Sequence, residues 1–224
     1  MIHTTREAAA WDSQYRDGRY VGEPPVAFVK DILDAARLAN FVGQPGLYIG
    51  CGNGRNYLPL LEGGLDLVGL DISRVAIEQL GERLPDGRSK LIVGDISAVA
   101  ADLRFPIVIG LQVFQHGNRS QAHEHIRAAQ ERVTPGGLFC LRVNAIGTDV
   151  EYDRKQTERG ADGGYTIRYL QGPKSGLDVH FFSEQELADL FDNWKPVLAL
   201  RPQVTWREPP HHGQWTQWEA IWSS

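Results

Sequence analysis

A glycine-rich segment at residues 50–54, Gly-Cys-Gly-Asn-Gly, is the part of the sequence whose residue types most clearly suggest ligand chemistry. Glycine has no Cβ, so the chain turns sharply there and a ligand can lie against the backbone. Asp71 follows about 20 residues further on. A carboxylate at that spacing accepts hydrogen bonds from both ribose hydroxyls of an adenosine-containing cofactor. Together, the glycines and Asp71 predict an adenosine site.

The elements around this segment must bring its glycines close to Asp71. Ser73 and Ser120 are each expected to cap a helix, because a serine oxygen accepts hydrogen bonds from the unpaired N–H groups of a first helical turn. Strands that alternate with helices predict a parallel sheet with right-handed crossovers. Apolar runs and periodicity place five strands, at 46–49, 66–71, 90–93, 105–111 and 138–143, and two further helices, at 25–40 and 55–61.

The pattern changes after residue 144. Residues 145–164 are polar and contain several glycines, which favours a mobile loop. Ser183 and Glu186 have the spacing of a capping box at the start of a further helix. Two strand pairs are expected, 165–170 with 177–182 and 195–207 with 214–222. We therefore predict an α/β fold: a Rossmann-like, seven-stranded, mostly parallel sheet with helices on both faces and an antiparallel C-terminal edge strand.

Two classes of adenosine cofactor suit this arrangement. A nicotinamide dinucleotide favours Gly-x-Gly-x-x-Gly, whose third glycine allows close packing of helix on strand. Here Arg55 occupies that third position and the loop reads Gly-x-Gly-x-Gly. S-adenosylmethionine has no pyrophosphate and requires only a flat backbone surface. The loop therefore fits S-adenosylmethionine better than NAD(P).

The sequence resembles the class I S-adenosylmethionine-dependent methyltransferases over most of its length, roughly from Trp11 to Trp222. The motifs that carry the resemblance are Gly-Cys-Gly-Asn-Gly-Arg-Asn at 50–56, Gly-Leu-Asp-Ile-Ser at 69–73, Gly-Asp-Ile at 94–96, Leu-Gln-Val at 111–113, Thr-Pro-Gly-Gly at 134–137 and His-Phe-Phe-Ser at 180–183. The last of these is similar to the small-molecule branch of the family.

The resemblance implies a role for each residue of the cofactor site. The glycine loop would hold the methionine part of S-adenosylmethionine, Asp71 the ribose, and Ile72, Asp95 and Ile96 the adenine. Asp95 is also a plausible helix cap. The family commonly has an acidic residue where Tyr48 stands, so another group must hold the cofactor's ammonium. The full predicted set is Gly50, Cys51, Gly52, Asn56, Asp71, Ile72, Asp95, Ile96, Leu111, Tyr15 and Trp11.

The acceptor should lie beyond the carboxyl ends of the strands, where open α/β sheets bind ligands. His116 is the candidate general base, because a neutral imidazole accepts a proton near pH 7; the alternative is that it only fills its loop. Trp11 and Tyr15 share a helix face and form either a lid over the cofactor or part of the core. Predicted acceptor-binding residues are Gln115, His116, Tyr165 and His180.

Composition narrows the class of partner. The 224-residue chain has a net charge of −5 and no basic run, which disfavours nucleic acid as a partner. No histidine cluster has metal-ligand spacing and no apolar stretch is long enough for a membrane span, so neither a metal nor a membrane is expected. We interpret the two cysteines as reduced thiols and expect a cytoplasmic protein.

The sequence therefore predicts a single domain over residues 1–224, with an N-terminal lid at 1–24 and an acceptor-side insertion at 145–182. The expected activity is methyl transfer from S-adenosylmethionine to an O, N or S atom of a small molecule by a monomer or homodimer. Three alternatives remain open at this point: a non-catalytic S-adenosylmethionine-binding protein, a NAD(P)-dependent oxidoreductase, and a nucleic-acid or protein methyltransferase, which the acidic net charge disfavours.

Overall fold

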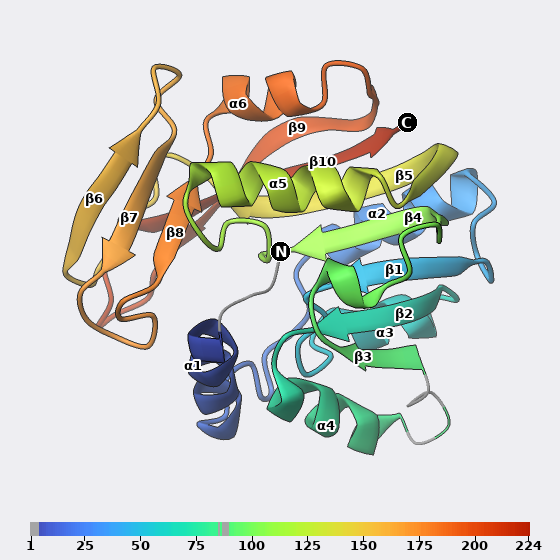
Figure 1. Cartoon of the computed structure of the whole chain (residues 1–224), viewed down its shortest axis with the longest axis horizontal. Coiled ribbons are helices and arrows are strands. Elements are labelled where there is room, and N and C mark those ends of the chain that lie inside the picture. The colour runs from blue at the N-terminus through green and yellow to red at the C-terminus, as the bar shows by residue number, and fades with distance from the viewer. Residues whose placement is uncertain (1–4, 85, 87–89) are drawn as a thin grey trace.

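The computed structural model describes residues 5–84, 86 and 90–224. Its main sheet has seven strands in the order β3-β2-β1-β4-β5-β10-β9 (Figure 1). The first five strands of this order are parallel, and β10 runs antiparallel to both of its neighbours, so the predicted sheet is confirmed. The strands are β1 (Pro45–Ile49), β2 (Asp66–Asp71), β3 (Leu91–Val93), β4 (Phe105–Leu111), β5 (Val133–Asn144), β9 (Lys195–Trp206) and β10 (Gln214–Ser223).

Helices cover both faces of this sheet, as predicted. Figure 1 shows α5 in front of the sheet and α2 and α3 behind it. One buried apolar cluster joins α2, α3 and α4 to the strands, and a second joins α5 and α6 to the opposite face. The helices are α1 (Thr5–Arg16), α2 (Phe28–Leu38), α3 (Tyr57–Glu62), α4 (Arg74–Arg83), the short 3₁₀ helix η2 (Ile96–Ala98), α5 (Arg119–Gln130) and α6 (Glu184–Leu190).

Two of the three predicted helix caps are confirmed and one is wrong. Ser73 caps α4 by accepting from the Ala76 N–H at 3.1 Å, and Ser183 caps α6 in a capping box. The cap of α5 is Asn118 and not Ser120. Asn118 has extended backbone, as an N-cap requires, whereas Ser120 lies inside the first turn and bonds to the exposed Glu124.

A second, three-stranded sheet follows β5, made of β6 (Arg154–Arg159), β7 (Tyr165–Tyr169) and β8 (Asp178–Phe181). The predicted hairpin is confirmed as the antiparallel pair β7 and β8. The prediction of a mobile loop at 145–164 is wrong in part, because β6 pairs with β7. All six residues of β6 are exposed, so no apolar alternation marks it in the sequence.

The small sheet is fixed beyond the carboxyl ends of the main strands. The arrowheads of β2 and β4 in Figure 1 point toward the side where α1 and the small sheet lie. The His180 N–H donates to the Gln115 carbonyl at 2.8 Å, and the Gly117 N–H donates to the Asp178 carbonyl at 3.0 Å. These bonds attach β8 to the loop that follows β4.

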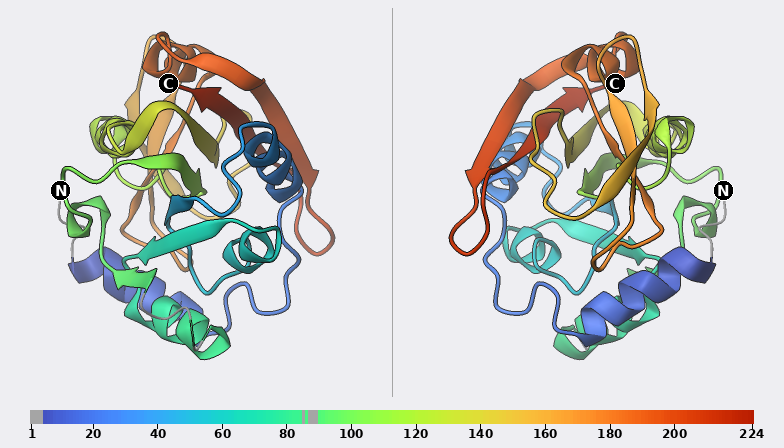
Figure 2. Two further views of the ribbon diagram at one scale, coloured as in Figure 1. Left: turned by 90° about the vertical axis from the view of Figure 1, so that its right-hand side faces the viewer. Right: turned by 90° about the vertical axis from the view of Figure 1, so that its left-hand side faces the viewer.

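Helix α1 lies beside α4 at the same end of the sheet (Figure 2). The Ser73 hydroxyl donates to the Asp12 carboxylate at 2.6 Å, and the Gln79 side chain donates to the Tyr15 carbonyl at 3.1 Å. None of the helices in the described part of the chain combines the length and the apolar composition of a membrane span.

Candidate functional site

The glycine loop connects β1 to α3 in a conformation that excludes side chains. Gly50 and Gly52 have φ of +73° and +55°, values that other L-residues rarely adopt. A Cβ on Gly50 would lie 2.7 Å from Val113, and one on Gly52 would lie 2.5 Å from the Tyr15 hydroxyl. Both positions therefore need glycine, for backbone conformation and for space.

Asp71 ends β2 next to this loop. Its side chain is buried, and its two carboxylate oxygens accept hydrogen bonds from the backbone N–H groups of Gly52 and Ser73, each at 2.8 Å. The carboxylate therefore fixes the glycine loop and the first turn of α4 to each other. The parallel pairing of β1 with β2 makes this possible, because it places the two carboxyl ends side by side.

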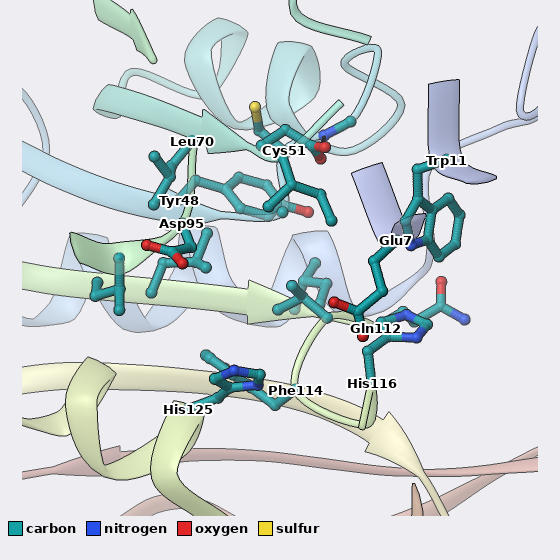
Figure 3. A pocket seen from close by; sticks show the side chains of 18 of the residues that line it. Glu7, Trp11, Tyr48, Cys51, Leu70, Asp95, Gln112, Phe114, His116 and His125 are labelled. Atoms are coloured by element: carbon teal, nitrogen blue, oxygen red, sulfur yellow. Dashed lines mark hydrogen bonds between the residues drawn. The ribbon is translucent and has the colours of Figure 1, made fainter. Parts of the chain in front are cut away.

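A large cleft opens at this point, with a volume of about 1190 Å³ counted out to its mouth. Every residue that the sequence predicted to bind the cofactor lines it. They come from α1, from the loops after β1, β2 and β3, and from the end of β4, as the topology of a parallel sheet requires. Figure 3 shows the cleft at close range.

Asp95 both lines the cleft and caps a helix, so the two readings of this residue are compatible. Its carboxylate accepts from the Ser97 N–H at 2.9 Å at the start of η2. The neighbouring Ile96 also lines the cleft and packs against the second apolar cluster. The predicted adenine contact at Asp95 and Ile96 remains a prediction.

An aromatic wall closes one side of the cleft. The indole of Trp11 meets the imidazole of His116 edge to face, with ring centroids 5.1 Å apart, and the Tyr15 ring lies 6.1 Å from Trp11. Tyr15 is buried, and burial raises the pKa of its hydroxyl well above the usual value, with Asp71 adding to the shift. Helix α1 therefore packs over the glycine loop and still presents Trp11 to the cleft.

Several residues of the cleft were missed by sequence reasoning. Glu7 lies one turn before Trp11 on α1 and brings a carboxylate to the cleft, and His125 brings an imidazole from α5 (Figure 3). Gln112 directly follows β4 and has φ of +60°, which is uncommon outside glycine and often marks functional sites. Tyr48, which stands where the family commonly has an acidic residue, also lines the cleft and is almost completely buried, with its ring 6.0 Å from Tyr57.

The cleft leaves out three of the four residues that were predicted to bind the acceptor. Gln115 is buried, and its amide donates to the Gln112 carbonyl at 2.7 Å. Tyr165 stacks on Phe181 within the small sheet, at 4.9 Å between ring centroids. His180 is fully buried in a polar network. Of the four residues, only His116 lines the cleft.

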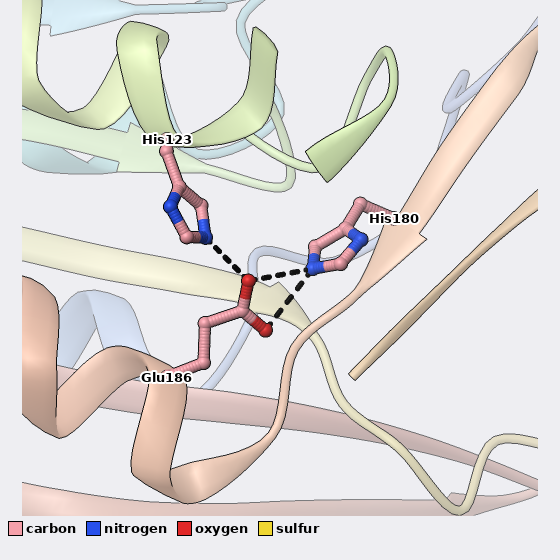
Figure 4. A group of neighbouring side chains, drawn as sticks. All are labelled: His123, His180 and Glu186. Atoms are coloured by element: carbon pink, nitrogen blue, oxygen red, sulfur yellow. Dashed lines mark hydrogen bonds and ion pairs between the residues drawn. The ribbon is translucent and has the colours of Figure 1, made fainter. Parts of the chain in front are cut away.

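The polar network around His180 is centred on Glu186 (Figure 4). His180 Nε2 lies 2.9 Å from one carboxylate oxygen of Glu186, and His123 Nε2 contacts the same oxygen. The hydroxyl of Thr166 meets His180 Nδ1 at 2.9 Å, and Arg119 Nε lies 3.2 Å from Glu186. These contacts join α5, α6 and the small sheet.

Two imidazoles and a carboxylate are also ligand types that zinc prefers. Here the Arg119 guanidinium lies against the same carboxylate oxygen that both imidazoles contact, and its positive charge opposes a second cation at that point. Each Nε2 atom already has a carboxylate acceptor. The cluster is therefore accounted for as a hydrogen-bonded network.

Comparison with known proteins gives consistent results. A family model described as a methyltransferase domain matches residues 47–137, from β1 to the turn in β5. TehB from Haemophilus influenzae has a similar structure, with a TM-score of 0.63 and 19% identity over 95% of this chain and 67% of TehB. No curated protein sequence matches the chain.

Two further solved structures cover nearly all of both chains. The 1,6-didemethyltoxoflavin-N1-methyltransferase of Burkholderia thailandensis, solved with 1,6-didemethyltoxoflavin and S-adenosylhomocysteine, has a TM-score of 0.65 and 18% identity over 100% of this chain and 92% of its own. The magnesium protoporphyrin IX methyltransferase of Synechocystis PCC 6803, solved with bound SAM, has a TM-score of 0.64 and 14% identity over 98% and 96%. Over residues 47–137 the chain therefore matches a methyltransferase domain, and the chain as a whole shares the fold of these solved methyltransferases.

Proposed function

We propose that the chain transfers a methyl group from S-adenosylmethionine to an O, N or S atom of a small-molecule acceptor. The observation that carries this proposal is the cleft in which the glycine loop and Asp71 meet at the carboxyl ends of β1 and β2. Three solved structures of similar fold contain S-adenosylmethionine or S-adenosylhomocysteine, which supports the choice of cofactor.

The cleft residues have the chemistry that this cofactor needs. Gly50 and Gly52 bring bare backbone to the cleft, where the methionine tail would lie, and the Asp71 carboxylate would accept hydrogen bonds from the ribose hydroxyls. Ile72 and Ile96 supply apolar surface for the adenine. When bound, S-adenosylmethionine supplies an electrophilic methyl group on a sulfonium sulfur. The protein then needs to hold the acceptor in line with the methyl–sulfur bond and exclude water.

The first prediction concerns cofactor binding. At 100 times its dissociation constant, S-adenosylhomocysteine should stabilise the fold by about 2.7 kcal/mol, which raises the melting temperature by roughly 5–10 °C. Thermal unfolding followed by circular dichroism measures the shift. NADH is the matched control and should leave the melting temperature unchanged, because Arg55 replaces the third glycine of a dinucleotide loop. A shift with NADH alone would reject the proposal.

His116 is the proposed general base for a hydroxyl acceptor. It lines the cleft on the loop after β4, and its ring packs against Trp11 in a perpendicular arrangement. A neutral imidazole there would accept the proton as the oxygen attacks the methyl group.

The second prediction tests this role. Replacing His116 with Gln should lower methyl transfer to a hydroxyl acceptor by about 10²- to 10⁴-fold and leave the affinity for S-adenosylhomocysteine within about twofold. The measurement is homocysteine release in a coupled assay across pH, where the acidic limb of the wild-type profile should disappear. His212→Gln, at an exposed position, is the control. Full turnover by the His116 variant would show that no base acts there.

A further inference from the structure

A second cavity, with a volume of about 540 Å³ counted out to its mouth, lies next to α1. Five segments line it: α1 with the residues just after it, the residues 148–152 after β5, the residues 169–174 at and after the end of β7, Arg207 after β9, and Trp215 of β10. Three of its lining side chains are cationic, Arg19, Lys174 and Arg207, and one is a carboxylate, Glu151. The proposed function uses none of these residues.

The charges of this cavity are not balanced. Glu151 is shared by Arg207, at 3.5 Å, and His211, at 3.0 Å. Within residues 5–84, 86 and 90–224, no carboxylate lies within 4.0 Å of Lys174 or Arg19, although Tyr20 and the more distant Glu23 carboxylate raise the pKa of Arg19. Half-buried cations without a counter-ion are unfavourable, so the cavity carries an excess of positive charge that a bound anion would neutralise.

Three of the residues that line this cavity also carry buried polar atoms without partners. Gln14 is only 6% exposed, yet neither its amide nitrogen nor its amide oxygen has a hydrogen-bond partner. The Arg19 Nε and the Trp215 Nε1 atoms are buried and equally unpaired. Three of these four atoms are N–H donors, which suits an oxyanion with several acceptor oxygens.

The environment of Lys174 agrees with this reading. Burial lowers the pKa of the Lys174 ammonium to about 8, and the nearby positive charge of Arg19 contributes to the shift. A bound anion would raise the pKa of Lys174, because a nearby negative charge favours the charged form of the ammonium.

The second cavity shares a wall with the cofactor cleft. The Lys174 ammonium lies 5.6 Å over the ring of Trp11, which lines that cleft and contacts His116. Gln14 and Tyr15 are neighbours on α1 and line the second cavity and the cleft respectively. A ligand group held at Lys174 would therefore place the rest of the molecule at the edge of Trp11, toward His116.

We propose that the cavity between Arg19, Lys174 and Gln14 binds a carboxylate or phosphate group of the methyl acceptor, so that the acceptor is a small anionic molecule. The inference rests on the proposed methyltransferase function. Carboxylate and phosphate are both compact oxyanions. The experiment distinguishes between them by adding acetate and inorganic phosphate as separate probes.

The first measurement is an NMR titration of the wild-type chain with ¹³C-labelled lysine, saturated with S-adenosylhomocysteine. The chain has five lysines, so the Lys174 signal can be assigned by its loss in Lys174→Met. Inorganic phosphate and acetate are added in turn at constant ionic strength. We expect one of them to raise the Lys174 pKa by about one unit, with saturation, and to leave the exposed Lys195 unchanged. Equal small shifts at both lysines would overturn the proposal.

The second measurement tests the acceptor. Small phenols and amines are assayed in matched pairs, each as its carboxylate or phosphate and as its neutral amide or alcohol, with homocysteine release as the readout. The anionic members should be methylated, and Lys174→Met should raise their KM at least tenfold without changing the affinity for S-adenosylhomocysteine. Equal turnover of the neutral members, or an unchanged KM, would reject an anionic acceptor.

The two proposals fail in different ways. If S-adenosylhomocysteine does not bind, the methyltransferase proposal fails, whatever the lysine titration shows. If S-adenosylhomocysteine binds and neither phosphate nor acetate changes the Lys174 pKa, only the anion site is rejected.

Discussion

Replacing Asp71 with Asn is expected to weaken the binding of S-adenosylhomocysteine about a hundredfold. The change removes the negative charge from a buried carboxylate that accepts two backbone hydrogen bonds at 2.8 Å and lines the cleft. It also turns an NH₂ group toward either the Gly52 or the Ser73 N–H, so one donor faces another. Losing charge-assisted hydrogen bonds to the ribose at roughly 1.5–3 kcal/mol each gives an effect of this size. Isothermal titration calorimetry measures it.

The chain offers a matched control on the same strand. Asp66 begins β2, as Asp71 ends it, and pairs at the surface with Lys90. Because surface ion pairs contribute little, Asp66→Asn should change the affinity by less than about twofold. If the Asp71 variant bound as tightly as the Asp66 variant, the carboxylate would have no part in holding the cofactor.

Replacing Glu186 with Ala is expected to destabilise the fold by about 3 kcal/mol. The Glu186 side chain is fully buried and is the acceptor shared by His123, His180 and Arg119. Its loss leaves the Nε2 atoms of His123 and His180 without their carboxylate partner, whereas Arg119 keeps its ion pair with Asp162. The capping box of α6 is lost as well. Urea unfolding followed by fluorescence measures the free energy of unfolding. Glu184→Ala, exposed in the same helical turn, is the control and should lose less than about 1 kcal/mol.

The pH dependence of stability checks the same prediction. Burial alone would raise the pKa of Glu186, but the hydrogen bonds from His123 and His180 and the charge of Arg119 outweigh it and lower the pKa to about 2, from an ordinary value of 4.5. A carboxyl group whose pKa is lower in the folded than in the unfolded state stabilises the fold at pH values above its unfolded-state pKa. This stabilisation is lost as the pH falls toward its folded-state pKa. The wild type should therefore lose stability between about pH 4.5 and 2 more steeply than Glu186→Ala. Parallel curves would contradict the network.

The residues on the cofactor side of the cleft could be predicted from the sequence, because they lie at the ends of strands that follow one another along the chain. The glycine-rich turn at 50–54 follows one strand and Asp71 ends the next. In any parallel pair of strands joined by a helix, these two ends lie next to each other. The same rule placed Asp95, Ile96 and Leu111 at one edge of the sheet, and all three line the cleft. The cofactor-binding role of each residue still awaits a binding measurement.

The acceptor side depended on contacts between distant segments, and sequence reasoning failed there. Strand alternation shows that His180 and Phe182 share a face, but not which face meets the cleft. His180 points to Thr166 and Glu186 because β8 pairs with β7 and with the loop at Gln115. The second cavity is formed by five separate segments of the chain, so no single sequence motif predicts it.

A crystal structure with bound S-adenosylhomocysteine would locate the cofactor itself. We expect both ribose hydroxyls within hydrogen-bond distance of the Asp71 carboxylate, the methionine tail against Gly50 and Gly52, and the sulfur facing Trp11 and His116. Clear density for the cofactor at another place, or a cleft that stays filled by the chain's own side chains at saturating cofactor, would contradict this placement.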